Sequence, residues 1–180
     1  MRFSKILSML VFLGAMVALA PSAHAQEKMA VGGGYQYAHI SFKEGDGINT
    51  NGFFVDFTGG LPQKTGPFSW AWIGELTGNY KDGHAYTYHG GGVGSFEMNQ
   101  QVKPFIDVQI GGITEGGDGG DSSSAFLFVI GGGAKFPLPG QKFNILLKLD
   151  YMRAFYGDDK GGGQNIFRLG IGASIPLPIK

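Results

Sequence analysis

The feature that most constrains this chain is a two-residue alternation of apolar and polar side chains, repeated in segments of about ten residues. The clearest segment begins at Phe143 and ends at Tyr151, with Lys148 and Asp150 on the polar side. Side chains of a β-strand point alternately to the two faces of a sheet, so each segment predicts a strand with one apolar and one polar face. Comparable segments lie at residues 29–37, 53–58, 68–80, 85–98, 106–110, 126–135 and 167–175.

The connections between these segments fall into two chemical kinds that alternate along the chain. Gly and Asp predominate at 43–51, 81–84, 115–124 and 157–165, whereas proline gathers at 61–67, 99–103 and 137–142. Such a pattern predicts an up-and-down meander with two different ends, here called the Gly/Asp rim and the proline rim. The strands are long for a soluble sheet but match tilted transmembrane strands. We therefore predict an all-β fold, an antiparallel up-and-down transmembrane β-barrel of about eight strands.

Aromatic side chains are expected near both rims, as in the girdles of membrane barrels. Those toward the Gly/Asp rim are Tyr80, Tyr86, Tyr88, Tyr151 and Tyr156, and those toward the proline rim are Phe68, Trp70, Trp72, Phe136 and Phe143. A secreted lipocalin-like barrel would invert the two faces, and alternation alone does not decide between them. The aromatic ends, and the opposite charges scattered over the polar face, favour the membrane.

The first residues have the order of a secretory signal peptide. Arg2 and Lys5 precede the apolar run 6–20, and Ala23 and Ala25 fit the small-residue cleavage rule, which places the cut after Ala25. The run is shorter than the roughly 20 residues of a membrane-spanning helix. We predict a signal peptide at 1–25 and one outer-membrane β-barrel domain at 26–180. Loss of the two basic residues leaves the mature chain slightly acidic, so nucleic acid is not an expected partner.

Ionisable residues share the polar face, which a closed barrel would turn inward. They are Asp56, Glu75, Asp107, Lys135, Lys148, Asp150 and Arg168. We predict that they form a structural network of paired charges in the lumen, since the interior of a small barrel is nearly filled by side chains and unpaired buried charge is costly. Glycosidase chemistry, which needs two carboxyl groups around an accessible sugar, is not favoured.

Two motifs raise the question of chemistry. The pair His39-x-Ser41 resembles the Ser/His pair of the outer-membrane lipid A deacylases, without their flanking residues or carboxylate partner. The run Gly116–Asp121 resembles one calcium-binding nonapeptide repeat, although such repeats bind calcium in stacks, and an acidic surface loop explains Asp118 and Asp121 equally well. With no Cys and no His spacing typical of a metal site, we predict no catalytic site, no cofactor and no metal.

Several short motifs resemble the outer-membrane β-barrel domain family, the small OmpA/OmpX-like barrels. They are Lys103-Pro104-Phe105, Gly131-Gly132-Gly133, Leu149-Asp150-Tyr151 and residues 164–172, and the resemblance extends from Gln26 to Lys180. It implies a barrel in the bacterial outer membrane, in contact with its lipid and lipopolysaccharide and assembled by the outer-membrane assembly machinery. Such barrels usually end on an aromatic residue, whereas this sequence ends on Lys180, which leaves that signal to Phe167 or makes the last residues a periplasmic tail.

The expected function is a structural or surface-interaction role, with loops outside and short proline-rich turns in the periplasm. The sequence does not identify an external partner. A barrel enzyme acting on lipid A and a narrow channel remain the alternatives.

Overall fold

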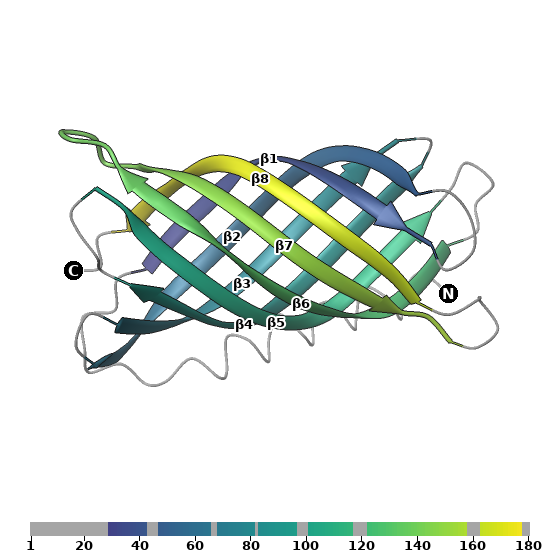
Figure 1. Ribbon diagram of the computed structural model, residues 1–180, viewed down its shortest axis with the longest axis horizontal. Helices are drawn as coiled ribbons and strands as arrows, with labels where there is room; N and C mark the ends of the chain where they lie inside the picture. The colour runs from purple at the N-terminus through teal and green to yellow at the C-terminus, as the bar shows by residue number, and fades with distance from the viewer. Residues whose placement is uncertain are drawn as a thin grey trace.

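The computed structural model describes residues 29–42, 47–65, 68–81, 83–96, 101–116, 122–157 and 163–177. They form eight strands (Figure 1), namely β1 (Met29–Ser41), β2 (Ile48–Thr65), β3 (Phe68–Tyr80), β4 (His84–Phe96), β5 (Lys103–Gly116), β6 (Ser122–Pro137), β7 (Asn144–Phe155) and β8 (Gly163–Leu177). Among the described residues, no helix is long and apolar enough to cross a membrane.

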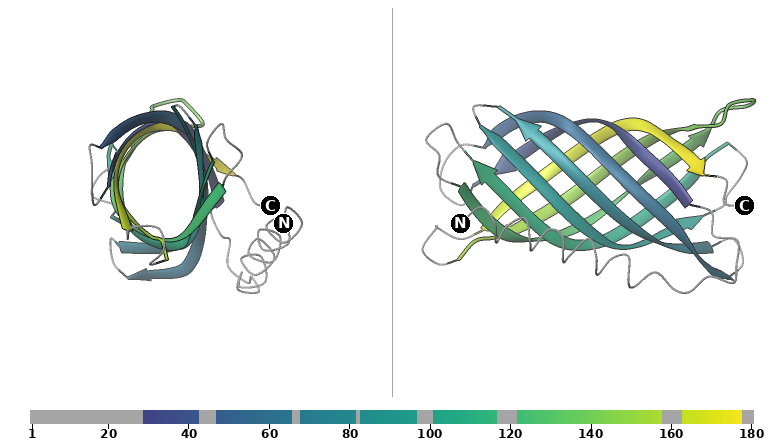
Figure 2. Two further views of the ribbon diagram at one scale, coloured as in Figure 1. Left: turned by 90° about the vertical axis from the view of Figure 1, so that its right-hand side faces the viewer. Right: turned by 180° about the vertical axis from the view of Figure 1, so that it is seen from behind.

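The strands close into a single barrel. Each pairs with its sequence neighbour in the antiparallel sense, and β8 returns to pair with β1 from Met29↔Leu177 to Ser41↔Asn165. Figure 2 shows the resulting closed ring, viewed along the barrel. Closure pairs every sheet edge, which a barrel in lipid requires because no water is present there to satisfy free backbone groups. The predicted all-β up-and-down barrel is confirmed.

The connection between β2 and β3 is shorter than the sequence indicated. We predicted a turn over residues 61–67, but β2 continues to Thr65, and its pairing with β3 resumes at Lys64↔Ser69 after a register shift that follows Gly60. A bulge absorbs extra residues and tolerates proline within a strand, so the proline that suggested a turn is compatible with continued pairing. The fourth predicted strand is described from His84 to Phe96, and its predicted end at Met98 lies outside the described residues.

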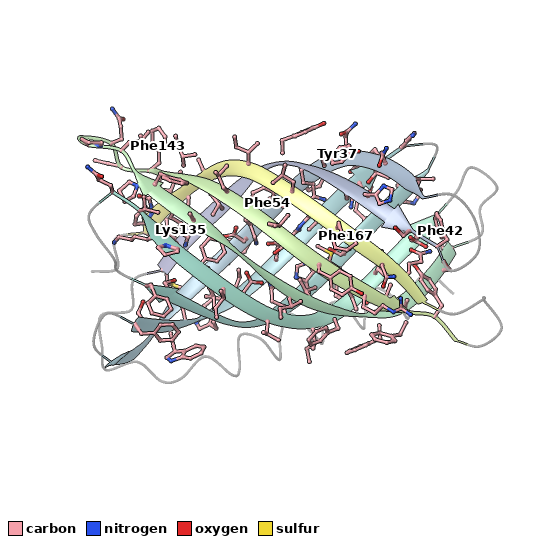
Figure 3. The ribbon with its side chains drawn as sticks, in the orientation of Figure 1. Tyr37, Phe42, Phe54, Lys135, Phe143 and Phe167 are labelled. Atoms are coloured by element: carbon pink, nitrogen blue, oxygen red, sulfur yellow. The ribbon has the colours of Figure 1, made fainter. Side chains whose placement is uncertain are left out.

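The outer wall of the barrel is apolar. Ile106 and Leu149 expose 60% and 63% of their surface, and large apolar side chains of every strand are similarly exposed. In Figure 3, Phe143 lies near one end of the barrel and Phe42 near the other, which identifies the proline rim and the Gly/Asp rim. Because soluble monomers rarely expose continuous apolar surface of this extent, lipid is the medium that fits this wall.

Glycine and aromatic residues occur together on the outer wall because the rings cover the glycines. An added Cβ at Gly94 would meet the ring of Phe68, and one at Gly78 would meet the ring of Phe53. The same relation joins Gly112 to Tyr88 and Gly59 to Trp72. An aromatic side chain lying across a neighbouring glycine stabilises strands that glycine alone would weaken.

Candidate functional site

The lumen consists of three layers, which succeed one another along each strand. On β7, the inward side chains from the proline rim to the Gly/Asp rim are Leu146, Lys148, Asp150 and Met152. The first layer is an apolar cluster, the proline-side plug, made by Phe54, Ile73, Val93, Phe105 and Leu146. The last is a second apolar cluster, the loop-side plug, made by Ala38, Ile40, Ala85, Ile113, Leu127, Val129, Met152, Ala154 and Ile166.

Between the plugs lies a layer of buried polar residues, the polar belt. Its members are Gln36, Asp56, Glu75, Thr77, Asn79, Thr87, His89, Asp107, Gln109, Lys148, Asp150 and Arg168. Seven strands contribute to it, and none of these side chains is appreciably exposed. Groups buried this deeply must find partners within the barrel.

Glu75 of β3 is the centre of the belt. The Nη1 atom of Arg168 donates a hydrogen bond to Glu75 Oε1, and the Nζ atom of Lys148 donates one to Glu75 Oε2. The guanidinium of Arg168 also reaches Asp150 Oδ2, from Nε at 2.7 Å and from Nη2 at 2.5 Å. Lys148 Nζ lies 4.0 Å from Asp56 Oδ2. Side chains from four strands are thereby joined across the lumen.

Uncharged side chains extend this network. Gln36 Oε1 accepts a bond from Arg168 Nη1 at 3.2 Å, and Gln36 Nε2 donates to Asn79 Oδ1 at 2.9 Å. On β5, Gln109 Nε2 donates to Asp107 Oδ1 at 2.6 Å, which turns Gln109 Oε1 toward His89 Nδ1, 2.9 Å away. The amides therefore link the central ion pairs to the barrel wall.

The structure brings five of the seven predicted network residues into ion pairs. Asp107 instead accepts its bond from Gln109, and its Oδ2 atom has no partner among the described residues. Lys135 lies toward the proline rim, with its ammonium 5.9 Å from the centre of the Phe105 ring. On β6, the one strand of the eight described that gives the belt no side chain, the inward position at this level is Gly131, where an added Cβ would collide with the carboxylate of Asp150. Glycine here makes room for the belt.

The two apolar plugs were not predicted, because the polar face was interpreted as polar throughout. A signal was present in the sequence: Leu127 and Val129 occupy inward positions within an uninterrupted apolar run, and Leu146 stands between Ile145 and Leu147. Apolar residues in both phases of a strand indicate that both faces meet an apolar medium.

The mouth at the Gly/Asp rim differs from the predicted girdle at one residue. Tyr156, expected among the lipid-facing aromatics, instead packs against the loop-side plug, and its hydroxyl donates to Glu115 Oε2 at 2.6 Å. Burial and this hydrogen bond raise the pKa of Tyr156 above its ordinary value. A pocket of about 290 Å³ opens at this mouth, between Phe42, Thr50 and Glu115.

Of the two remaining sequence motifs, the structure describes the pair His39-x-Ser41 but only the first residue of Gly116–Asp121. His39 Nδ1 lies 2.7 Å from Asn49 Oδ1, and no hydrogen bond joins His39 to Ser41 in the ranges described. Asp118, Asp121 and the predicted cleavage site at Ala25 lie outside the described residues. No group of three or more His, Cys, Asp or Glu within the described ranges could hold a metal ion.

Comparison with known proteins agrees with the barrel. The sequence profile described as "Outer membrane protein beta-barrel domain" matches residues 8–174. Among solved structures, the Neisserial surface protein A is 18% identical, with a TM-score of 0.58 over 83% of this chain and 97% of that one. A search of the curated proteins found no match.

Two further solved structures have the same fold. Ail, the attachment invasion locus protein of Yersinia pestis, is 17% identical, with a TM-score of 0.51 over 84% of this chain and 100% of its own. The outer membrane enzyme PagL is 19% identical, with a TM-score of 0.52 over 84% of this chain and 99% of its own.

Proposed function

The chain belongs to the outer membrane protein β-barrel domain family, and on that premise we propose that it is a surface-presenting barrel that neither conducts solutes nor catalyses a reaction. It is an integral protein of the bacterial outer membrane. Its external loops would carry any interaction, and the barrel would hold them at the cell surface.

The filled lumen is the observation that carries this proposal. Leu127, Val129 and Ala154 are 0% exposed, and Arg168 at the centre of the belt is 1% exposed. A permeating ion would have to lose its hydration in two apolar plugs and displace ion pairs between them. The arrangement suits a rigid plug better than a pathway.

The different rims support an orientation with the Gly/Asp connections outside. At the proline rim, β6 and β7 are joined by a tight turn in which Gln141 N donates to Leu138 O at 3.0 Å and Gly140 has a φ of 75°. Short turns on the periplasmic side and longer loops outside are general in outer-membrane barrels. The names of two similar structures, Neisserial surface protein A and the attachment invasion locus protein, are compatible with loops as the functional part.

An enzymatic role is the alternative that the fold leaves open, since the outer membrane enzyme PagL shares the fold. A serine hydrolase needs a base within hydrogen-bond reach of the nucleophile. Here the ring of His39 is bound to Asn49, and no His39–Ser41 bond is made in the described chain. We therefore assign no catalytic role to Ser41, and we expect purified protein to leave the acyl chains of lipid A intact; deacylation that disappears in Ser41→Ala would contradict this assignment.

The proposal includes the route to the membrane. We propose that residues 1–25 are removed after Ala25 and that the outer-membrane assembly machinery inserts the barrel. Intact-mass measurement of protein purified from outer membranes should give a chain beginning at Gln26. A mass that retains residues 1–25 would refute the cleavage.

Cysteine labelling in whole cells tests the surface role directly, because the chain has no native cysteine. We expect a membrane-impermeant maleimide to label Asp118→Cys, in a Gly/Asp connection, in intact cells. Gln141→Cys, in the turn at the proline rim, is the matched control and should react only after the outer membrane is permeabilised. The reverse pattern would contradict the orientation, and labelling of neither site in intact cells would contradict surface presentation.

A further inference from the structure

A polar patch interrupts the apolar outer wall near the Gly/Asp rim. Arg153 of β7 and Asn165 of β8 are cross-strand partners on the outward face, and Ser41 of β1 is the next partner in the same row. His39 and Asn49 continue the patch across β1 and β2. The neighbouring outward side chains are aromatic, with Phe155 and Phe167 exposed by 50% and 53%.

Arg153 is held in a defined position within this patch. Its Nη1 atom donates to Asn165 Oδ1 at 2.5 Å, and the same oxygen accepts a bond from the Tyr151 hydroxyl at 2.8 Å. The guanidinium carbon lies 5.8 Å from the centre of the Phe155 ring. An added Cβ at Gly163 would lie 2.9 Å from both Nε and Nη2, so glycine at this position leaves room for the guanidinium.

The guanidinium has no acidic partner among the described residues, since every ion pair found there involves Glu75, Asp56 or Asp150 inside the lumen. A cation on the lipid-facing wall is tolerated near the membrane interface and becomes costly toward the bilayer centre. Arginine presents five N–H donors, and only Nη1 is bound to Asn165. A positioned guanidinium of this kind is suited to a phosphate.

We propose that Arg153, positioned by Asn165 and Tyr151, binds a phosphate group of lipopolysaccharide in the outer leaflet. The hydroxyl of Ser41 lies beside Asn165 in the strand register and offers a further donor to the same headgroup. The acyl chains would lie against the apolar wall that continues below the patch at Leu149 and Leu169. This inference rests on the proposed orientation, which places the Gly/Asp rim at the outer surface.

A lipid is the source of phosphate that the surroundings favour. The patch is not a recess in the lumen but part of the outward wall, with exposed rings beside it that a membrane would cover. A headgroup phosphate arrives with acyl chains that bury those rings. Inorganic phosphate would gain only the polar contacts.

The experiment measures binding of lipid A to the folded, purified barrel in detergent by native mass spectrometry. Wild-type protein should retain phosphorylated lipid A in preference to its dephosphorylated form. Arg153→Gln should bind the phosphorylated form about tenfold more weakly, as expected for loss of one charge-assisted contact, and should lose the preference. Arg153→Lys should keep part of it, because the charge remains and the planar fork is lost.

Lys142→Gln is the matched control, since it removes an exposed cation at the proline rim. It should bind like wild type, and heat-modifiable gel mobility should show that every variant is folded. Equal binding of both lipid A forms by wild type, or unchanged binding by Arg153→Gln, would overturn the proposal. Displacement of lipid A by inorganic phosphate at equal concentration would overturn the lipid as the source. Because binding in detergent does not depend on orientation in the cell, failure here is distinguishable from failure of the cysteine-labelling test.

Discussion

Glu75→Gln should be the most damaging conservative substitution in the lumen. The carboxylate accepts hydrogen bonds from both Arg168 and Lys148, and His89 Nε2 lies 3.6 Å from its Oε1 atom. Glutamine preserves the volume but removes the charge that compensates two buried cations. Removing one partner of a buried ion pair costs about 3–5 kcal/mol, because the remaining charge is left without compensation.

After this substitution Arg168 and Lys148 keep different numbers of acidic partners, so the two cations do not contribute equally to the loss of stability. Arg168 keeps its two hydrogen bonds to Asp150, whereas Lys148 keeps, among the described residues, a single ion pair, with Asp56 at 4.0 Å. We therefore expect Glu75→Gln to lower the free energy of unfolding by about 3–5 kcal/mol, chiefly through Lys148. Asp56→Asn, which removes the more distant carboxylate, should cost about 1 kcal/mol.

A double-mutant cycle with Lys148→Met isolates the interaction. Glu75→Gln/Lys148→Met removes the uncompensated cation, so the double variant should be about 1–3 kcal/mol more stable than the sum of the single losses predicts. Reversible urea unfolding in lipid vesicles, followed by the fluorescence of Trp70 and Trp72 on the outward face, measures each value. A loss below about 1 kcal/mol for Glu75→Gln, or strict additivity in the cycle, would refute the central role of this carboxylate.

Three further predictions concern the wall, the loop-side plug and the mouth. Gly34→Val should prevent barrel closure and abolish heat-modifiable gel mobility, because an added Cβ would lie 2.5 Å from the Gly172 Cα atom, whereas Gly92→Ala, which meets nothing within 4 Å, should fold normally. Leu127→Ala should lower the free energy of urea unfolding by about 2–5 kcal/mol through a cavity in the plug. Tyr156→Phe should lower it by about 1–2 kcal/mol, since Glu115 loses a hydrogen bond, and a neutral result would contradict the mouth contact.

Most of the fold could be predicted from sequence, because strand phase is a local property. The alternation of Phe143–Tyr151 and of the segment at 167–175 fixes which side chains share a face, and the rims follow from the two kinds of connection. The extent of β2 could not be predicted in this way. Pairing of Lys64 with Ser69 depends on a bulge formed with β3, which is a property of two strands and not of one segment.

The candidate site was predictable in composition but not in arrangement. Inward phase assigns Glu75, Lys148 and Arg168 to one face. Whether their charged groups meet depends on the position of each residue along the barrel axis, which the inter-strand registers determine. For the same reason, Lys135 shares the inward phase but lies beside Phe105, away from the ion pairs. Arg153 was not singled out, since its significance depends on its cross-strand neighbour Asn165.

Electrical recording of the purified wild-type barrel in a planar lipid bilayer distinguishes a filled lumen from a conducting one. Insertion should be verified independently by heat-modifiable gel mobility of the same sample. With the polar belt closed between the proline-side plug and the loop-side plug, we expect the bilayer current to stay at its baseline at either polarity. Reproducible, steady current steps from the folded protein would contradict a filled lumen and would assign the barrel to the channels.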